Sequence, residues 1–73
     1  MTYLDFLKEK PILYGSITVN SKEKLGFFKP KFNRYSNNIE YQYYTLNGNI
    51  GKGGFTMLRA FNLLNINALK LAS

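Results

Sequence analysis

The spacing of apolar residues changes twice along the chain, and these changes constrain its fold more than any other feature. Residues 3–9 show helical spacing, which Pro11 stops. Residues 12–46 alternate between apolar and polar with the period of two that is typical of strands. From about residue 55 the spacing is helical again. The predicted fold is α+β with the order αβββα, a three-stranded antiparallel sheet with two helices on one face.

The ends of these elements carry local signals. Thr2 and Asp5 have the spacing of a capping box at the start of the first helix. The predicted strands are residues 12–20, 25–34 and 39–46. Pro30 cannot donate a backbone hydrogen bond, so the second strand is expected at a sheet edge or at a bulge.

The last helix is predicted from about residue 55 to the end of the chain. Asn62, Asn65 and Asn67 weaken it, because Asn competes for backbone hydrogen bonds, and a break near Asn65 is the alternative. Residues 66–73 are therefore open between helix and strand. The predicted core consists of Leu4, Leu7, Ile17, Val19, Leu58, Phe61 and Leu64.

The composition argues against an enzyme and against a metal or cofactor site. The 73 residues are expected to form a single small domain spanning residues 1–73, and they include neither cysteine nor histidine. The commonest metal ligands and the commonest general base are thus missing, and the four acidic residues are scattered. We therefore expect no catalytic residues, no cofactor and no metal.

The net charge of +6 indicates a polyanionic partner such as RNA, unless it serves only to keep an aromatic-rich protein soluble. No signal-peptide pattern and no apolar run of roughly 18 residues is visible, so we expect a soluble intracellular protein without a membrane partner. Nine asparagines, with common Lys, Ile and Tyr, are typical of AT-rich coding sequences, as in phages and organelles.

Residues 22–34 are both basic and aromatic. Glu23 is the only acid among five basic residues, which alternate with three phenylalanines. Cations beside aromatic rings suit phosphate contacts and base stacking. The alternative is a solvated edge strand that lysine protects from aggregation. Tyr41, Tyr43 and Tyr44 are expected to be divided between the core and an exposed sheet face.

Residues 48–61, GNIGKGGFTMLRAF, join a glycine-rich stretch to the start of the last helix. A P-loop is excluded because Gly54 stands where lysine is required, and a dinucleotide fingerprint because Thr56 stands where glycine is required. Residues 51–54 match the GxxG loop of KH domains, but a strand rather than a helix precedes them. The stretch is expected either to hold phosphate at a helix start, aided by Lys52, or only to reverse the chain.

The order of elements resembles that of the double-stranded-RNA-binding domain, and some residues match that family locally. Pro11 and Tyr14 stand at its Pro-x-Tyr-like element, with one extra residue between them. The glycines of residues 48–54 form the approach to the last helix, where Thr56 takes a hydroxyl position and Ala60 an alanine position. The N-terminal domain of the ribosomal S5 family is similar. The resemblance implies a module that binds the backbone of duplex RNA.

The chain departs from this family at its binding motif. Met57 and Leu58 replace the paired lysines that open the last helix, with only Lys52 and Arg59 nearby, and the Gly-Pro-x-His element is missing. The prediction is a small RNA-binding module or ribonucleoprotein component that contacts phosphate backbone. The alternative is a protein-binding module, such as a phage-encoded inhibitor or a small subunit of a larger assembly. The candidate nucleic-acid-binding residues are Lys22, Lys24, Lys29, Lys31, Arg34, Lys52, Gly53, Gly54 and Arg59.

Overall fold

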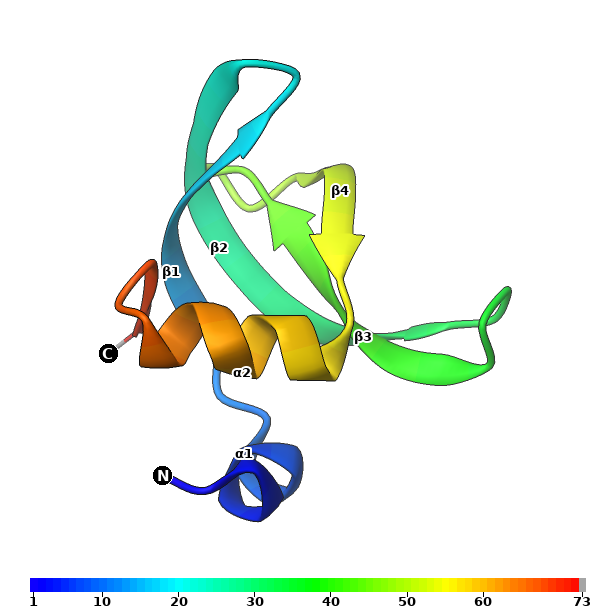
Figure 1. The fold of residues 1–73 in the computed structure, drawn as a ribbon. Coiled ribbons are helices and arrows are strands. Elements are labelled where there is room, and N and C mark those ends of the chain that lie inside the picture. Colours follow the sequence, from blue (N-terminus) through cyan, green and yellow to red (C-terminus); the bar gives the residue numbers. More distant parts are fainter. Residues whose placement is uncertain (73) are drawn as a thin grey trace.

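The fold is α+β with two helices and an antiparallel sheet, as predicted, but the sheet has five strands instead of three (Figure 1). The computed structural model describes residues 1–72, apart from the side chain of Val19. In chain order the elements are α1 (Tyr3–Glu9), β1 (Leu13–Val19), β2 (Lys22–Asn33), β3 (Asn38–Tyr44), β4 (Ile50–Phe55), α2 (Met57–Asn65) and β5 (Leu69–Leu71). Neither helix is long and apolar enough to cross a membrane, within the part of the chain described.

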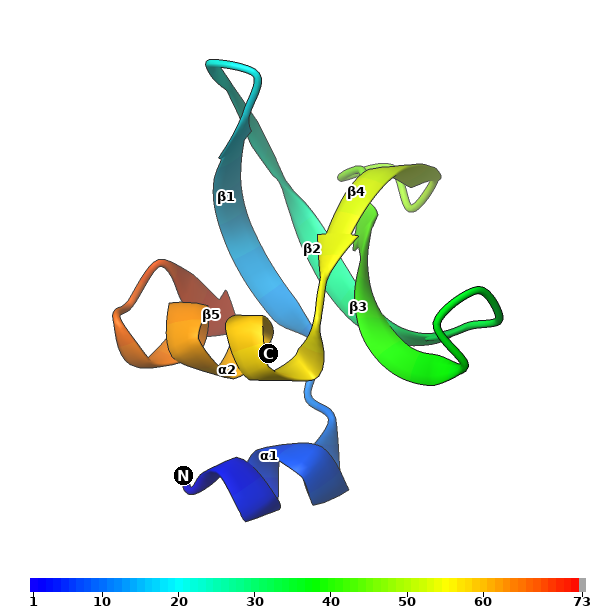
Figure 2. The ribbon, with the colours of Figure 1, turned by 45° about the vertical axis from the view of Figure 1, so that its right-hand side comes forward.

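The strands are arranged in the order β4-β3-β2-β1-β5, and each neighbouring pair is antiparallel. β2 is the longest strand, and it changes partner along its length. Its first part, residues 22–28, pairs with β1, while its last part, residues 27–33, pairs with β3. Because the two pairings share only Phe27 and Phe28, the β1–β2 hairpin extends well beyond the other strands (Figure 2).

The glycine-rich stretch forms strand β4 rather than a loop leading into the helix. Gly51 of β4 and Gly26 of β2 give room to the ring of Tyr43: a Cβ on Gly51 would lie 2.5 Å from Cδ2 of that ring, and a Cβ on Gly26 would lie 2.6 Å from Cε1. The Tyr43 hydroxyl donates to the Leu25 carbonyl at 3.0 Å, which fixes the ring across β2. At Gly51, glycine is needed for packing inside the sheet.

β4 also bulges. Gln42 of β3 pairs with Gly54, and Tyr44 pairs with Ile50. Residues 51–53 of β4 therefore lie opposite the single residue Tyr43. Gly53 has φ of +112°, and a Cβ on Gly54 would meet the carbonyl oxygen of Tyr41. The positive φ at Gly53 and the close backbone approach at Gly54 mean that these two positions of β4 require glycine.

The last helix ends at Asn65, so the prediction of a helix to the chain end is wrong and the break near that residue is confirmed. Asn67 adopts a positive φ of 62°, which reverses the chain. β5 then pairs with β1, and Leu69 lies beside Gly15 with 1% of its surface exposed. The chain forms a strand rather than a helix here, because the Leu69 side chain becomes buried in the space beside Gly15.

The core is more aromatic than predicted. Its buried residues are Phe6, Leu13, Phe28, Tyr41, Tyr43, Phe55, Ala60 and Leu69. The predictions for Leu4 and Leu58 are wrong, since these side chains are 69% and 54% exposed. Four other predicted core residues are half-buried, namely Leu7, Ile17, Phe61 and Leu64. The Val19 side chain lies outside the described residues. Helical spacing alone did not show that α1 turns Phe6, rather than its leucines, toward the sheet.

Helix α1 is held at both ends. Thr2 and Asp5 form the predicted capping box, and the hydrogen bonds from the Thr2 backbone and side chain lower the pKa of the Asp5 carboxyl. After the helix, the Tyr41 hydroxyl donates to the Pro11 carbonyl at 2.6 Å. Phe6 packs between Tyr41 and Phe61, with ring centroids 5.5 Å from each. Both helices therefore pack on the core side of the sheet.

Candidate nucleic-acid interface

The sheet face opposite the helices carries cations and aromatic rings. Side chains along a strand alternate between the two faces, and Phe28, Tyr41 and Tyr43 point into the core. Their neighbours therefore point the other way, to a face that we call the outer face. The outer face includes Tyr14, Phe27, Lys29, Lys31, Glu40, Gln42 and Tyr44.

An aromatic row crosses this outer face at right angles to the strands. Tyr14 pairs with Phe27, and Phe27 pairs with Tyr44 on the next strand. The rings of Tyr14 and Phe27 lie 5.4 Å apart between centroids. Lys70 stands opposite Tyr14 on β5, and the exposed Ile50 stands opposite Tyr44 on β4. None of the three rings is fully buried.

Two lysines of β2 lie beside this row. Lys29 Nζ is 5.1 Å from the centroid of the Tyr44 ring, a distance at which the cation is attracted to the ring face. Lys31 follows on the same face and pairs in register with Glu40. Alternation along the strand thus brings two of the predicted cations to one surface.

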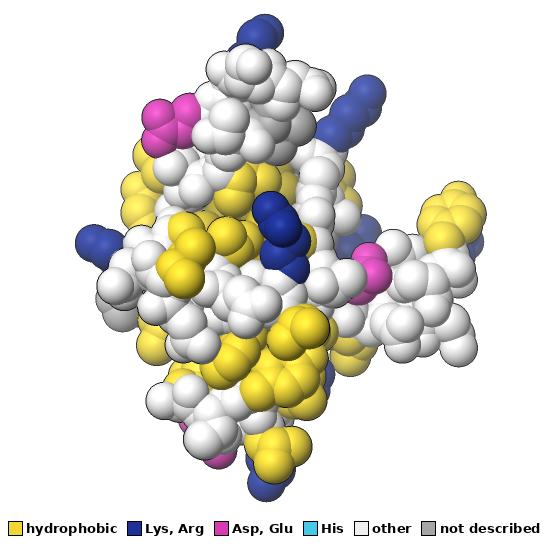
Figure 3. Space-filling model, in the orientation of Figure 1, with side chains coloured by type: hydrophobic (Ala, Val, Ile, Leu, Met, Phe, Trp, Pro, Cys, Tyr) yellow, Lys and Arg dark blue, Asp and Glu magenta, His cyan; other side chains and the backbone are white. Residues whose placement is uncertain are grey.

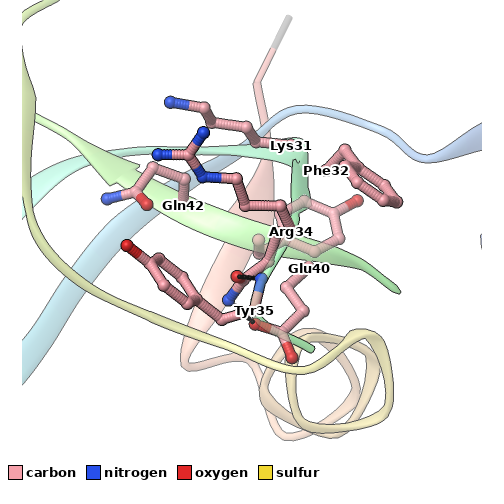
Figure 4. A pocket seen from close by; sticks show the side chains of 8 residues that line it. Lys31, Phe32, Arg34, Tyr35, Glu40 and Gln42 are labelled. Carbon is pink, nitrogen blue, oxygen red and sulfur yellow. Dashed lines mark hydrogen bonds between the residues drawn. The ribbon is translucent and has the colours of Figure 1, made fainter. Parts of the chain in front are cut away.

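A pocket of about 500 Å³ lies where β2 and β3 are joined. Its lining includes Lys31, Phe32, Arg34, Tyr35 and Gln42. Figure 4 shows the basic ends of Lys31 and Arg34 on the same side as the Gln42 amide and the Tyr35 ring, whereas Phe32 and the Glu40 carboxylate lie on the other side. One end of the pocket is therefore basic and offers an aromatic ring.

The turn between β2 and β3 holds Tyr35 in place. The Tyr35 N–H donates to Asn33 Oδ1 at 2.9 Å, and Asn38 Nδ2 donates to the Ser36 carbonyl at 3.1 Å. Asn37 adopts φ of +60°, which Asn tolerates well. The turn is thus ordered by its own side chains, although the Tyr35 ring is 89% exposed. Arg34 Cζ is 5.8 Å from the centroid of this ring.

Glu40, the acidic residue in this pocket, is hydrogen-bonded to Asn33. Glu40 Oε1 accepts a hydrogen bond from Asn33 Nδ2 at 3.0 Å. This bond directs the carboxylate toward β2 and away from the basic end of the pocket (Figure 4). An anion approaching Lys31 and Arg34 therefore meets two cations before it meets the carboxylate.

Gln42 joins the pocket to the bulge in β4. Its Nε2 donates to the carbonyls of Gly51 and Gly53, at 2.6 Å and 3.1 Å. These two carbonyls fix the orientation of the amide, because only its nitrogen can donate to them. The Gln42 side chain therefore satisfies backbone groups that the bulge leaves unpaired.

The other predicted site residues are dispersed. Lys24 lies over the ring of Tyr43, 6.0 Å from its centroid, on the core side of the sheet, and Lys22 begins β2 at the hairpin end. Lys52 is exposed in the bulge of β4. Gly53 and Gly54 follow it, and glycine is needed there for the backbone conformation. Arg59 lies on α2. Among the predicted cations, the structure groups Lys29, Lys31 and Arg34.

The start of α2 is capped by the chain itself. The Thr56 side chain accepts a hydrogen bond from the Arg59 N–H at 3.2 Å, as an N-cap residue does. Met57 and Leu58 follow directly in the first turn. The expected phosphate site at this helix start thus has one of its backbone donors already occupied.

Sequence reasoning missed Tyr14 and Gln42 on the outer face and Tyr35 in the pocket. The alternation of β1 and β3 could have placed the first two opposite the core residues. Tyr35 gives no such signal, because it lies in a turn whose geometry depends on Asn33 and Asn37.

The helical side of the molecule is different in character. Figure 3 shows hydrophobic side chains gathered across α1 and the start of α2, with Lys and Arg spread singly over this face. A second pocket of about 490 Å³ lies here. We call its apolar lining the helical patch, and it comprises Tyr3, Leu7, Ile39, Met57 and Leu58.

Searches for metal-binding groups among the described residues and for related proteins give no hits. Within residues 1–72 there is no group of three or more His, Cys, Asp or Glu side chains that could hold a metal ion. Comparisons with protein-family models, with curated proteins and with solved structures find no match.

Proposed function

We propose that this protein is a small RNA-binding module that holds phosphate backbone on its outer face. The observation that carries the proposal is the grouping of Lys29, Lys31 and Arg34, with aromatic rings beside them, where β2 meets β3. Cations with interleaved aromatic rings suit backbone contacts and base stacking. The net charge of +6 adds a long-range attraction for any polyanion.

The outer face also has the stiffness that such a surface needs. Lys29 and Lys31 project from the central strand, and hydrogen bonds to Asn33 and from Asn38 order the adjacent turn. Side chains on an ordered framework lose less conformational freedom on binding. The cations act as backbone contacts and carry no sequence information, so binding is expected to tolerate unrelated RNA sequences.

Titration of labelled RNA at two salt concentrations tests the proposal. Three phosphate contacts predict a slope of about −2 for log affinity against log salt on single strands. Between about 50 mM and about 200 mM salt, affinity should then fall on the order of fifteenfold. RNA that does not bind even at the lower salt concentration would refute the proposal.

The helical patch favours a second candidate function, binding of a protein. Leu58 and Ile39 are 54% and 40% exposed beside a pocket, and exposed apolar clusters of this kind mark interaction sites. The two functions use opposite sides of the sheet, so they can be separated. A protein partner recovered from the native host after nuclease treatment should be lost with Leu58→Asp and retained with Lys29→Gln. The reverse pattern would exclude this candidate.

A further inference from the structure

We infer that the pocket between β2 and β3 binds an unpaired nucleotide, with its base stacked on Tyr35 and its phosphate held by Lys31 and Arg34. This inference rests on the proposed function and names its substrate class, single-stranded rather than duplex RNA. It also differs from the binding of duplex backbone that the resemblance to the double-stranded-RNA-binding domain implies.

The first support is the position of Tyr35. Its ring is 89% exposed, so it contributes little to the core, yet three side chains around it order its turn. These bonds order the backbone that carries Tyr35, so an exposed ring on this turn can stack on a base face at a reduced entropic cost. A base inside a duplex already stacks on its neighbours, so the partner must be unpaired.

The second support is the distribution of charge around the ring. Lys31 and the Arg34 guanidinium lie at the same end of the pocket as the Tyr35 ring, and Arg34 Cζ is 5.8 Å from its centroid (Figure 4). A phosphate attached to the stacked base would therefore meet two cations. The Glu40 carboxylate, which also lines the pocket, accepts a hydrogen bond from Asn33.

The third support is size and continuity. At about 500 Å³ the pocket lies within the range of small-molecule sites and can hold one nucleotide. From Lys31 the same face of β2 continues to Lys29, whose ammonium lies over Tyr44. The strand therefore offers a neighbouring cation and a neighbouring ring to the next nucleotide.

The test compares oligouridylate of about ten nucleotides, a length within the usual site size, with an RNA duplex carrying the same number of phosphates. Binding is measured by anisotropy of a labelled strand and by quenching of tyrosine fluorescence. The single strand should bind more tightly. Tyr35→Ala should weaken its binding roughly tenfold, because one stacked base is lost.

Three variants separate stacking from folding. Tyr35→Phe keeps the ring and should retain wild-type affinity. Ile66→Ala removes an exposed side chain at the C-cap of α2, away from both pockets, and should leave RNA affinity unchanged. Melting temperatures should be the same for the wild type and all three variants, Tyr35→Ala included, since the residues changed are largely exposed.

Each result has a distinct meaning. If Tyr35→Ala binds the single strand as the wild type does, or if the wild type prefers duplex, the inference fails. The proposed function still stands in that case if Lys29→Gln with Lys31→Gln weakens binding. If the wild type binds neither the single strand nor the duplex, both the inference and the proposed function fail. Polyglutamate bound as tightly as RNA would assign the pocket to acidic protein segments and overturn the inference.

Discussion

Tyr43 lies across two strands that carry no side chain where its ring passes. Gly26 on β2 and Gly51 on β4 leave this space, and the bond from the Tyr43 hydroxyl to Leu25 holds the ring there. The ring also packs on Phe28, with centroids 5.5 Å apart. Two of the six glycines in the chain are therefore explained by packing at single residues.

Because the Tyr43 ring fills the space beside Gly51, Gly51→Ala should be destabilising. The new methyl group would lie 2.5 Å from Cδ2 of a ring that cannot move away, so we expect a loss of about 1–3 kcal/mol in the free energy of unfolding. Lys52→Ala, an exposed neighbour in the same strand, is the control and should change it by less than about 0.5 kcal/mol. Urea unfolding measures both. Equal midpoints for the two variants would show that the ring is free to move.

Tyr41 gives a prediction about alkaline pH. Its phenol is buried, and burial raises its pKa above the ordinary value of 10.0. Since the folded state favours the neutral form, the stability it contributes is present below about pH 10 and is lost as the pH rises further. Tyr41→Phe should lower stability by about 1–2 kcal/mol at neutral pH, because the hydrogen bond to Pro11 is lost.

Above pH 10 the Tyr41→Phe protein should lose stability less steeply than the wild type, and urea midpoints across the pH range would reveal this. Tyr35→Phe, which removes the hydroxyl of an exposed ring, is the control variant. A wild-type profile that is flat in the alkaline range would contradict the role given to burial of Tyr41.

The elements show where sequence periodicity succeeds and where it fails. The helix over residues 3–9 and the three strands of residues 12–46 were predicted, because their spacing reflects burial on one face. β4 was missed because a strand rich in glycine has no side-chain alternation to detect. β5 was missed because Leu64, Ala68 and Leu71 continue a helical spacing that the chain does not use.

Two leucines of β5 separate the strand from the predicted helix. Helical spacing would bury Leu71, whereas pairing with β1 buries Leu69 and leaves Leu71 49% exposed. Leu69→Ala should therefore lower the free energy of unfolding by about 2–4 kcal/mol, and Leu71→Ala by much less. A larger effect at Leu71 in thermal unfolding would favour the helix.

At the scale of the whole molecule, the bent sheet separates an apolar side from a basic side. The helices cover the core face, and Lys29 and Lys31 of β2 lie on the outer face with Tyr44, next to the pocket that Arg34 lines. The sequence predicted the basic and aromatic character of residues 22–34, but the grouping needed the strand register. Lys24 shows why, since it belongs to the same basic run and yet lies over Tyr43 on the core side.

The central claim is that RNA binds where Lys29 and Lys31 lie, and not simply wherever the protein is positive. The direct test compares Lys29→Gln/Lys31→Gln with Lys8→Gln/Arg59→Gln, two exposed cations on the helices. Both double variants lower the net charge by two, from +6 to +4. Glutamine is preferred to glutamate because Lys31 pairs with Glu40, where a second carboxylate would repel.

The measurement is the affinity for labelled single-stranded RNA as a function of salt. For Lys29→Gln/Lys31→Gln the account predicts a loss on the order of tenfold at low salt and a slope near −0.7, as for one remaining phosphate contact. For Lys8→Gln/Arg59→Gln it predicts a slope that stays near −2. Equal losses of affinity in the two double variants would contradict a localised interface and leave only net charge as the cause of binding.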